Sequence, residues 1–399
     1  MGSYLNPGNF SFRGSLRSKI YVDKSKLIAK TNEVLCTEQK YICVSRPRRF
    51  GKSMAANMLA AYYDRSENTE DLFQNLAISR EKSYEENLNQ YDVIKINMQE
   101  FLSMAGTIEK MLEMLKDYLV VDFEEAYPEV RFRDKNNLIQ TMKDVFSYTK
   151  CPFVILIDEW DCLFREYKQD KEAQKKYLDF LRAWLKDKDY IAMAYMTGIL
   201  PIKKYGSHSA LNMFTEYSMT DPGELAEYFG FTELEVSAIC EKYGMSFEEA
   251  KTWYDGYQLV AHRQWKDECY SMYNPKSVVE AMLRHKFGTY WNQTETYEAL
   301  KIYIQMDMDG LKASVIRMLT GDSVSINTGT FSNDMTTFAT KDDVLTLLVH
   351  LGYLTYNSID GTVSIPNKEV SQEYIKAIST MNWHGVADSV EASRKLLAF

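Results

Sequence analysis

The stretch YICVSRPRRFGKS, residues 41–53, decides the fold. A short apolar run rich in β-branched residues leads into a loop with one proline, three arginines and one glycine, and the helix-forming run MAANMLAAYY follows. Strand, loop and helix with Lys52 and Ser53 at the loop-to-helix junction is the context of a phosphate-binding P-loop. There the loop N–H groups and the positive helix end bind phosphates. The consensus has glycine where this chain has Arg46, so a second signal is needed.

That second signal is FVILIDE, residues 153–159. A continuous apolar run of this length suits a strand buried on both faces of a parallel sheet, and ligands bind at the carboxyl ends of such strands. Asp158 is placed to hold the Mg²⁺ shell. Glu159 is placed to orient and deprotonate an attacking water.

A third signal is YIAMAYMT, residues 190–197, another apolar strand that ends in Thr197, which can sense a γ-phosphate. Each signal has an ordinary alternative. Gly-Lys-Ser is often only a turn into a helix, and carboxylates after a strand often cap the next helix. Glu159 can instead be an N-cap or a salt-bridge partner. The three signals in order, each at the end of a predicted strand, favour nucleotide binding.

The motifs resemble the predicted AAA-ATPase-like family of bacteria and archaea. The resemblance is carried by YVDKSKLIAKTN, SRPRRFGKS, LIDEWD, TGILPIKKYGSHSALNMFTEYSM, WYDGYQL and YNPKSVVEAM, and it covers nearly the whole chain. RPRRFGK followed by Ser or Thr is the recurrent P-loop of that family, so arginine at position 46 is normal there. The resemblance implies an α/β P-loop NTPase fold of the ASCE/AAA-like type, related to STAND-type and archaeal ATPases. It consists of a parallel sheet with helices on both faces, then a helical lid and a winged-helix-like module.

We expect ATP and Mg²⁺ as ligands. The expected nucleotide-binding residues are Arg46, Pro47, Arg48, Arg49, Phe50, Gly51, Lys52 and Ser53. The expected catalytic residues are Glu159, Lys52 and Thr197, and the expected metal ligands are Ser53 and Asp158. Arg48 and Arg49 can neutralise phosphates or anchor the loop to carboxylates such as Glu159 or Asp161, and the sequence leaves both open. Lys203 and Lys204 can contact the γ-phosphate or act across a subunit interface, or they form a solvated surface pair.

Four parts are expected along the chain. They are a basic segment packing on the core (1–40), the ATPase core (41–220), the helical lid (221–290) and the winged-helix-like module (291–399). Expected strands cover 41–45, 93–98, 153–158, 190–197 and 214–219, and expected helices cover 107–120, 135–148 and 171–188. The pairs Thr232 with Glu235, Ser246 with Glu249 and Thr340 with Asp343 predict helix starts. An Asp-Gly turn at 360–361 predicts a β-hairpin.

Many members of the resembled family also carry a C-terminal nuclease domain of the PD-(D/E)xK type. The last hundred residues contain no apolar strand followed by Glu-x-Lys, and the chain stops at Phe399 within an apparent helix, VEASRKLLAF. We therefore expect the nuclease part to be absent and the chain to cleave no DNA.

Composition and charge argue against membrane, secreted and nucleic-acid-binding classes of protein. Hydrophobic residues make up 45% and charged residues 26% of the chain, as in ordinary soluble proteins. The absence of an 18-residue apolar run, of a signal-peptide pattern and of paired cysteine spacing predicts a cytoplasmic protein with free thiols. The net charge of −9 argues against bulk affinity for nucleic acid. Residues 1–52 nevertheless carry 11 Lys and Arg against 3 Asp and Glu. This segment can concentrate positive electrostatic potential at a bound triphosphate, or it can balance the negative charge of acidic helices.

The favoured interpretation is slow Mg²⁺-dependent ATP hydrolysis used as a conformational switch that controls an effector domain or partner. One alternative is a nucleotide-dependent regulatory module without hydrolysis, which would not need Glu159 and Thr197. The other is a nucleic-acid-binding protein that uses the winged helix. The few basic residues in 342–366 argue against that alternative. The sequence allows an oligomer and leaves the effector open.

Overall fold

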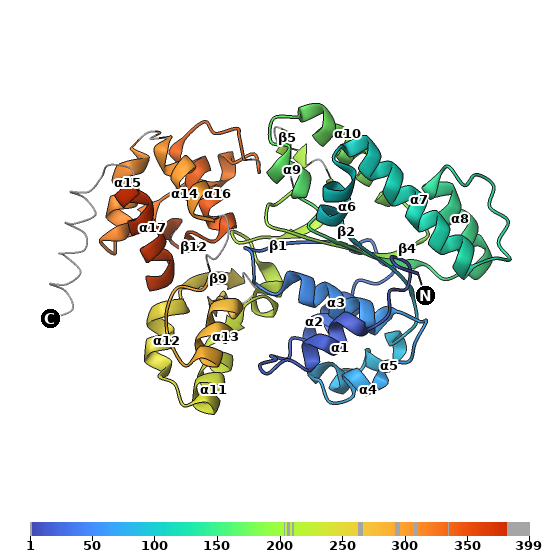
Figure 1. The fold of residues 1–399 in the computed structure, drawn as a ribbon, viewed down its shortest axis with the longest axis horizontal. Helices are drawn as coiled ribbons and strands as arrows, with labels where there is room; N and C mark the ends of the chain where they lie inside the picture. The colour runs from blue at the N-terminus through green and yellow to red at the C-terminus, as the bar shows by residue number, and fades with distance from the viewer. Residues whose placement is uncertain are drawn as a thin grey trace. The chain divides into compact units, whose positions relative to one another are not determined.

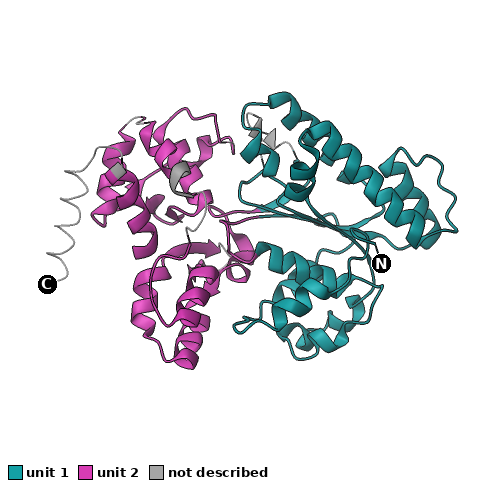
Figure 2. Ribbon diagram, viewed as in Figure 1, with its two compact units in different colours: residues 1–44, 52–216 teal, residues 45–51, 217–399 magenta. Residues whose placement is uncertain are grey.

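The computed structural model describes residues 2–380, except for positions 203, 206, 207, 210, 262–265, 292–295, 307, 309 and 334. The expectations for Lys203, for the Lys204 side chain and for a helix at VEASRKLLAF lie outside the described residues. The chain divides into two compact units, residues 1–44 with 52–216 and residues 45–51 with 217–399 (Figure 2). The predicted four-part division stays a prediction.

A five-stranded sheet forms the centre of the first unit, in the order β2-β3-β4-β1-β7. The strands are β1 (Tyr41–Ser45), β2 (Asp92–Asn97), β3 (Phe153–Asp158), β4 (Ile191–Gly198) and β7 (Thr215–Tyr217). β3 runs parallel to both β2 and β4. Every residue of β1, β3 and β4 is buried, as their continuous apolar sequences predict for strands covered on both faces. The ends of β3 and β4 therefore lie side by side.

Helices cover both faces of this sheet (Figure 1). On one side lie α1 (Phe10–Leu16), α2 (Lys26–Asn32), α3 (Lys52–Tyr63), α4 (Glu70–Phe73) and α5 (Tyr84–Asn87). On the other side lie α6 (Met98–Ala105), α7 (Ile108–Ala126), α8 (Leu138–Thr149), α9 (Cys162–Glu166) and α10 (Lys171–Leu185). The predicted α/β P-loop NTPase fold class is confirmed.

The N-terminal segment packs within the first unit. The backbone N–H groups of Tyr4 and Leu5 donate to Asp122 Oδ2 at 2.8 and 3.0 Å, and Leu5 forms a β-bridge with Ile94. Asn6 donates through Nδ2 to Asp92 at 2.9 Å. These contacts tie the start of the chain to α7 and to β2.

The second unit contains helices and two small sheets. The helices are α11 (Glu233–Tyr243), α12 (Phe247–Tyr254), α13 (Pro275–Arg284), α14 (Thr296–Gln305), α15 (Leu311–Leu319), α16 (Lys341–Leu351) and α17 (Lys368–Thr380). The expectation of a purely helical lid was incomplete, because β8 (Phe231–Thr232), β9 (Tyr257–Ala261) and β10 (Glu268–Tyr273) form an antiparallel sheet there. In β9 the side chain of Gln258 is exposed and the other four residues are buried, so the strand shows no clear alternation in the sequence.

The predicted hairpin near the end of the chain is confirmed. β12 (Thr355–Asn357) and β13 (Thr362–Ser364) pair antiparallel, with Asn357 opposite Thr362, around the Asp360-Gly361 turn. β11 (Val324–Ser325) adds a third strand against β13. α16 precedes the hairpin, and the Thr340 N–H donates to Asp343 at its start at 3.2 Å. Helix followed by hairpin is the expected winged-helix-like arrangement.

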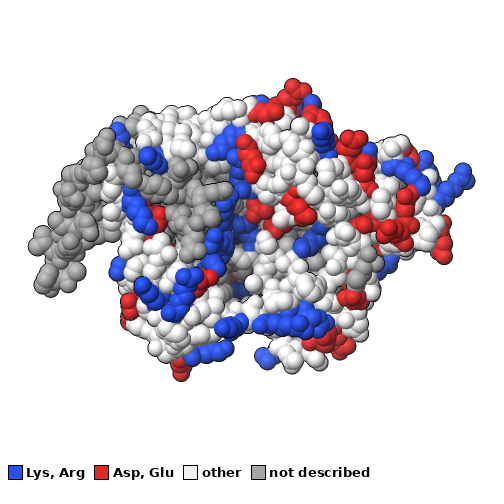
Figure 3. Space-filling model, in the orientation of Figure 1, with Lys and Arg blue, Asp and Glu red and all other residues white. Residues whose placement is uncertain are grey.

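The helical surface of the first unit carries mixed charge. On the face in Figure 3, acidic and basic side chains alternate over α7, α8 and α10. Lys176 pairs with Glu109 at 2.8 Å and with Glu172 at 3.1 Å, and Arg182 pairs with Asp179 at 3.1 Å. Such exposed pairs contribute little to stability, about 0–1 kcal/mol each. These helices do not present a continuous basic patch on that face.

Glu369, the second residue of α17, is a buried carboxyl in the second unit, with an exposed fraction of 1%. It accepts the backbone N–H groups of Tyr290 at 2.6 Å and of Trp291 at 2.9 Å. Burial raises the pKa of Glu369 to about 7, although the two N–H donors oppose the shift. A raised carboxyl pKa favours the folded state below the unfolded value, and this stabilisation is lost as pH rises toward 7.

We predict that the second unit loses up to about 3 kcal/mol of stability between pH 4.5 and 7.5 through Glu369. Glu369→Gln should remove this part of the pH dependence, since the amide oxygen can still accept the two N–H groups. Urea unfolding of both proteins at several pH values measures the effect. Glu248→Gln, an exposed carboxylate of α12, is the control and should keep the wild-type pH dependence. Parallel pH curves for wild type and Glu369→Gln would contradict the prediction.

Candidate functional site

Lys52 is the first residue of α3 and is buried, with an exposed fraction of 5%. Burial lowers the pKa of Lys52, while the carboxylates of Glu159, Asp158 and Asp161 oppose that shift. Its ammonium therefore lies within electrostatic reach of the carboxylates that follow β3. The first turn of α3 has no acidic residue, and Ser53 is exposed there. The positive end of this helix is compatible with an anion.

Asp158 is the last residue of β3 and is held by two donors. The Thr197 hydroxyl and the backbone N–H of Glu159, the latter at 3.0 Å, both donate to Asp158 Oδ1. Among the described residues no donor uses Oδ2, so this oxygen is available to a ligand. Thr197 is fully buried and orients Asp158 directly. The expected contact of Thr197 with a γ-phosphate stays a prediction.

Glu159 has an unusual backbone and a charged partner. Its φ is 53°, in the left-handed region that residues other than glycine rarely adopt. Arg165 Nη2 donates to Glu159 Oε2, and the two side chains are 9% and 24% exposed respectively. The contact agrees with the salt-bridge alternative for Glu159. Unusual backbone of this kind gathers at functional sites, so it is compatible with a catalytic role as well.

Asp161 joins the ends of β3 and β4. Its Oδ2 accepts the backbone N–H groups of Ile199 at 3.0 Å and Leu200 at 2.8 Å, and it lies 3.3 Å from Arg165 Nε. The Trp160 N–H donates to the Thr197 carbonyl at 3.0 Å, which closes the same junction. The segment after each strand is thus fixed to the segment after its neighbour.

The buried charges of this junction shift one another's pKa. Burial raises the pKa of Glu159, which Asp161 and Asp158 reinforce, whereas Arg165 and Lys52 oppose it. Burial lowers the pKa of Arg165, but Asp161 and Glu159 raise it by more. Burial also raises the pKa of the Cys162 thiol, which favours the inert buried thiol predicted for it.

The loop residues 45–51 make their own contacts in the second unit. Arg46 Nη1 donates to the Tyr217 carbonyl at 2.8 Å, and the guanidinium lies 5.5 Å from the centre of the Phe229 ring. The Phe50 ring packs edge-on against Tyr257 at 5.1 Å, and the Phe50 carbonyl accepts the Gly230 N–H at 3.1 Å. Arg46 and Phe50 are thus packed within the protein.

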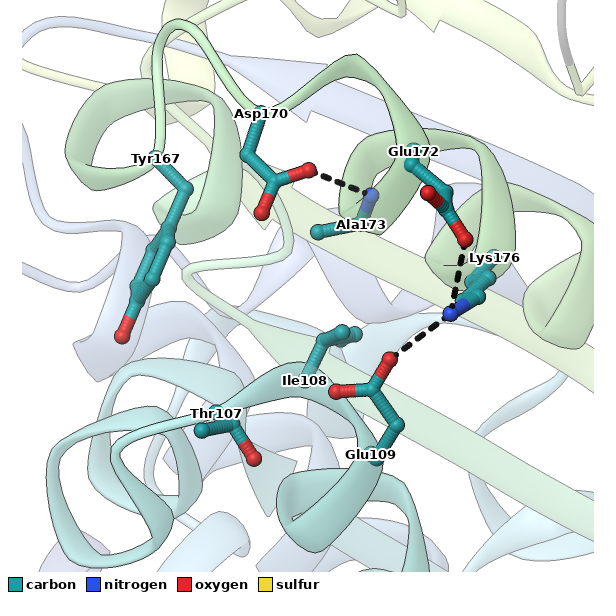
Figure 4. Close-up of a pocket in the computed structure, with 8 residues that line it drawn as sticks. All are labelled: Thr107, Ile108, Glu109, Tyr167, Asp170, Glu172, Ala173 and Lys176. Carbon is teal, nitrogen blue, oxygen red and sulfur yellow. Dashed lines mark hydrogen bonds and ion pairs between the residues drawn. The ribbon is translucent and has the colours of Figure 1, made fainter.

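A pocket of about 220 Å³ lies elsewhere in the first unit (Figure 4). It is lined by Thr107, Ile108, Glu109, Tyr167, Asp170, Glu172, Ala173 and Lys176. Asp170 caps α10 through the Ala173 N–H at 2.9 Å. Lys176 is held between Glu109 and Glu172. No predicted site residue lines this pocket, and its polar groups are engaged in capping and ion pairs.

Comparison with known proteins agrees with the loop and the strand-end carboxylates. A family model described as "Predicted AAA-ATPase" matches residues 12–207. Those residues are similar to the AAA-ATPase-like family. This match includes β1, the loop, β3 and β4, and hence every residue of the candidate site. The AAA-ATPase-like resemblance seen in the sequence is confirmed over this region.

An uncharacterized protein in the vnfD 5′ region of Azotobacter chroococcum mcd 1 is 24% identical to this chain over 287 residues, which is 69% of this chain. The chain spans about half, 51%, of that relative's length. Two solved Aeropyrum pernix structures are also similar. The ORC1 protein in complex with DNA is 12% identical, with 95% of this chain and 98% of that chain covered and a TM-score of 0.31. The ORC2 protein in ADPNP-ADP complexes is 11% identical, with 93% of this chain and 91% of that chain covered and a TM-score of 0.27. Likenesses at these TM-scores do not bear on the site.

Sequence reasoning placed Asp158, Glu159 and Thr197 at the ends of predicted strands. The structure pairs these strands and places Lys52 within electrostatic reach of Asp158 and Glu159. It missed Arg165, for which the only signal was the four- and six-residue spacing from Asp161 and Glu159. Arg165 is the described partner of both carboxylates. The suggested anchoring of the loop arginines to these carboxylates stays a prediction.

Gly198, at the end of β4, allows the junction to close. A Cβ there would lie 2.7 Å from both Asp161 Oδ1 and Trp160 Nε1. We predict that Gly198→Ala destabilises the first unit by about 1–3 kcal/mol through overpacking, measured by urea unfolding. The same change at Gly14 in α1 meets no atom within 4 Å and should stabilise by about 0.5–1 kcal/mol. Equal effects of the two substitutions would contradict the prediction.

Proposed function

We propose that this AAA-ATPase-like protein binds ATP with Mg²⁺ and hydrolyses it slowly, and that the cycle serves as a conformational switch. The observation that carries the proposal is the burial of Lys52 at the start of α3, within electrostatic reach of the Asp158 and Glu159 carboxylates that follow β3. A lysine buried beside carboxylates at strand ends, next to a helix N-terminus, is the arrangement used for phosphoryl transfer.

The donor atoms suit Mg²⁺. Asp158 Oδ2 is a carboxylate oxygen that no described donor uses, and Ser53 offers a hydroxyl oxygen; Mg²⁺ prefers such hard oxygen ligands. The described residues contain no cluster of three or more His, Cys, Asp or Glu side chains arranged for a metal. Mg²⁺ is usually held by one or two carboxylates together with substrate phosphates, so a protein cage is not required. Bound there, the ion would neutralise charge on the phosphate oxygens.

The chain's own residues supply the remaining steps. The first N–H groups of α3 and the Lys52 ammonium bind and orient the terminal phosphates. Glu159 positions a water and accepts its proton. Thr197 keeps the Asp158 carboxylate in one orientation. The residues of the loop itself, 46–51, are proposed to line the phosphates.

A switch in which nucleotide is bound but rarely turned over is the second candidate. The engagement of Glu159 by Arg165 supports it, because a carboxylate in an ion pair is a weaker base. The effector, a domain or a separate partner, stays a proposal, as does an oligomer. Among the described residues no helix is both long and apolar enough to cross a membrane. The six free cysteines are consistent with the proposed cytoplasmic location.

We expect Lys52→Ala to weaken ATP binding about 10-fold or more, because it removes a charge-assisted contact of roughly 1.5–3 kcal/mol. Titration of the folded variant with ATP and Mg²⁺ measures this. Lys26→Ala is the matched control, since Lys26 is the exposed first residue of helix α2, and it should bind as wild type does. Unchanged affinity in Lys52→Ala would rule out the proposed site.

Glu159→Gln separates binding from hydrolysis. The amide keeps the shape and loses the base, so ATP should still bind while phosphate release falls by about 10²–10⁴-fold. Asp158→Asn should instead weaken the dependence of binding on Mg²⁺. Equal phosphate release by wild type and Glu159→Gln would show that Glu159 is structural and would favour the second candidate.

A further inference from the structure

Arg165, on α9, contacts two carboxylates that follow β3 and reaches the end of β4 through one of them. We propose that Arg165 is the positioning residue of the site: it holds the Glu159 carboxylate in the orientation that hydrolysis uses. The proposal rests on the proposed ATPase activity. Arg165 acts through Glu159 and needs no contact of its own with the nucleotide.

The contacts form one continuous chain. The backbone N–H groups of Ile199 and Leu200 hold Asp161 Oδ2, at 3.0 and 2.8 Å. Asp161 Oδ2 lies 3.3 Å from Arg165 Nε, and Arg165 Nη2 donates to Glu159 Oε2. Arg165 Nε has no hydrogen-bond partner among the described residues, so Asp161 holds the guanidinium through their ion pair, while Nη2 of the planar group points at Glu159. The ion pairs thus link the Glu159 carboxylate to the backbone after β4.

Burial strengthens this series of contacts. The Asp161 side chain is fully buried and Arg165 is 9% exposed, so water screens their attraction weakly. Glu159 is the most exposed of the three, at 24%. Arg165 therefore connects the buried carboxylate of Asp161 to the carboxylate of Glu159, which solvent reaches. A general base needs this combination of a fixed position and access to water.

Within the described part of the chain, one of the two Glu159 carboxylate oxygens accepts a hydrogen bond. Oε2 accepts from Arg165, and among the described residues no donor uses Oε1. Holding a carboxylate by one oxygen leaves the other in a defined place to accept from a water molecule. The left-handed backbone at Glu159 gives the side chain a departure direction that ordinary strand geometry does not offer. Arg165 and the backbone conformation together specify where that oxygen lies.

The same ion pair, if it held Glu159 in an unproductive orientation, would be a brake. The two roles predict opposite signs. Removing a positioning residue lowers turnover, whereas removing a brake raises it. Available Oε1 and the fixed path from Asp161 favour positioning.

The test uses the full chain with Arg165→Gln and Arg165→Lys, and follows phosphate release and ATP binding. We expect kcat to fall by about 10-fold or more in Arg165→Gln, with ATP affinity within about two-fold of wild type. Arg165→Lys keeps the charge but loses the planar guanidinium, so its kcat should lie between those of the wild type and Arg165→Gln. Arg182→Gln, which removes an exposed arginine paired with Asp179 on α10, should leave both quantities unchanged.

An unchanged or raised kcat in folded Arg165→Gln overturns the proposal, as does an equal loss of kcat and affinity. If Arg165→Gln does not fold, Arg165→Lys alone tests the proposal, and a kcat equal to that of the wild type in Arg165→Lys overturns the proposal.

Absence of phosphate release by wild type would refute the proposed function and not the contact. The contact is then tested by the ¹⁵Nε–¹Hε NMR signal of Arg165. It should shift in Glu159→Gln, and an unchanged signal overturns the inference.

Discussion

The packing of the loop 45–51 constrains the rest of the molecule. These residues belong by their contacts to the second unit, whereas β1 before them and α3 after them belong to the first. Arg46 is fixed to the Tyr217 carbonyl and the Phe229 ring, and Phe50 is fixed against Tyr257. Tyr257 in turn donates to the Gly352 carbonyl at 2.8 Å, at the end of α16. The loop is therefore continuous with the core of the second unit.

This packing explains how an arginine can stand where the consensus has glycine. Glycine is needed where the backbone must adopt a positive φ. In this loop the positive values lie at Arg49, with φ 69°, and at Gly51, with φ 93°. Position 46 needs no such freedom, so its side chain is available as an anchor. The chain passes directly from Gly51 into Lys52, the first residue of α3.

Some of this architecture could be predicted from the sequence. β1 and β3 are exact matches to the apolar runs at 41–45 and 153–158, because a strand buried on both faces has no polar interruption. The helix predicted over 107–120 runs to Ala126, since its last turns are amphipathic with Asp122 and Phe123 buried. The lid sheet was missed because β9 (YQLVA) and β10 (ECYSMY), although as long as β1 and β3, are not continuous apolar runs. Tyr254 and Tyr257 are buried aromatics of the second unit.

Some features of the candidate site could likewise be predicted from the sequence, and others could not. Residues at the ends of neighbouring parallel strands lie close together, so the two predicted strand ends that carry Asp158 and Thr197 meet once β3 pairs with β4. The positive φ of Glu159 and the choice of Arg165 as its partner depend on how α9 leaves β3, which no local pattern records. The same limit applies to Arg46, whose partners Tyr217 and Phe229 are distant in sequence. Long-range partners of charged side chains were the part that the sequence could not supply.

The charges at the strand ends bear on why Mg²⁺ would be required. Asp158, Glu159 and Asp161, when ionised, face the cations Lys52 and Arg165, so the buried group carries one excess negative charge. A triphosphate brought beside it would meet net repulsion in a poorly screened setting. The two positive charges of Mg²⁺ offset that excess and the charge of the phosphate oxygens. Arg165 contacts Asp161 and Glu159, and Lys52 is the residue proposed to bind the phosphate. Under the proposed function, affinity for the nucleotide without metal would be low, because the carboxylates proposed to support hydrolysis would also repel the phosphates.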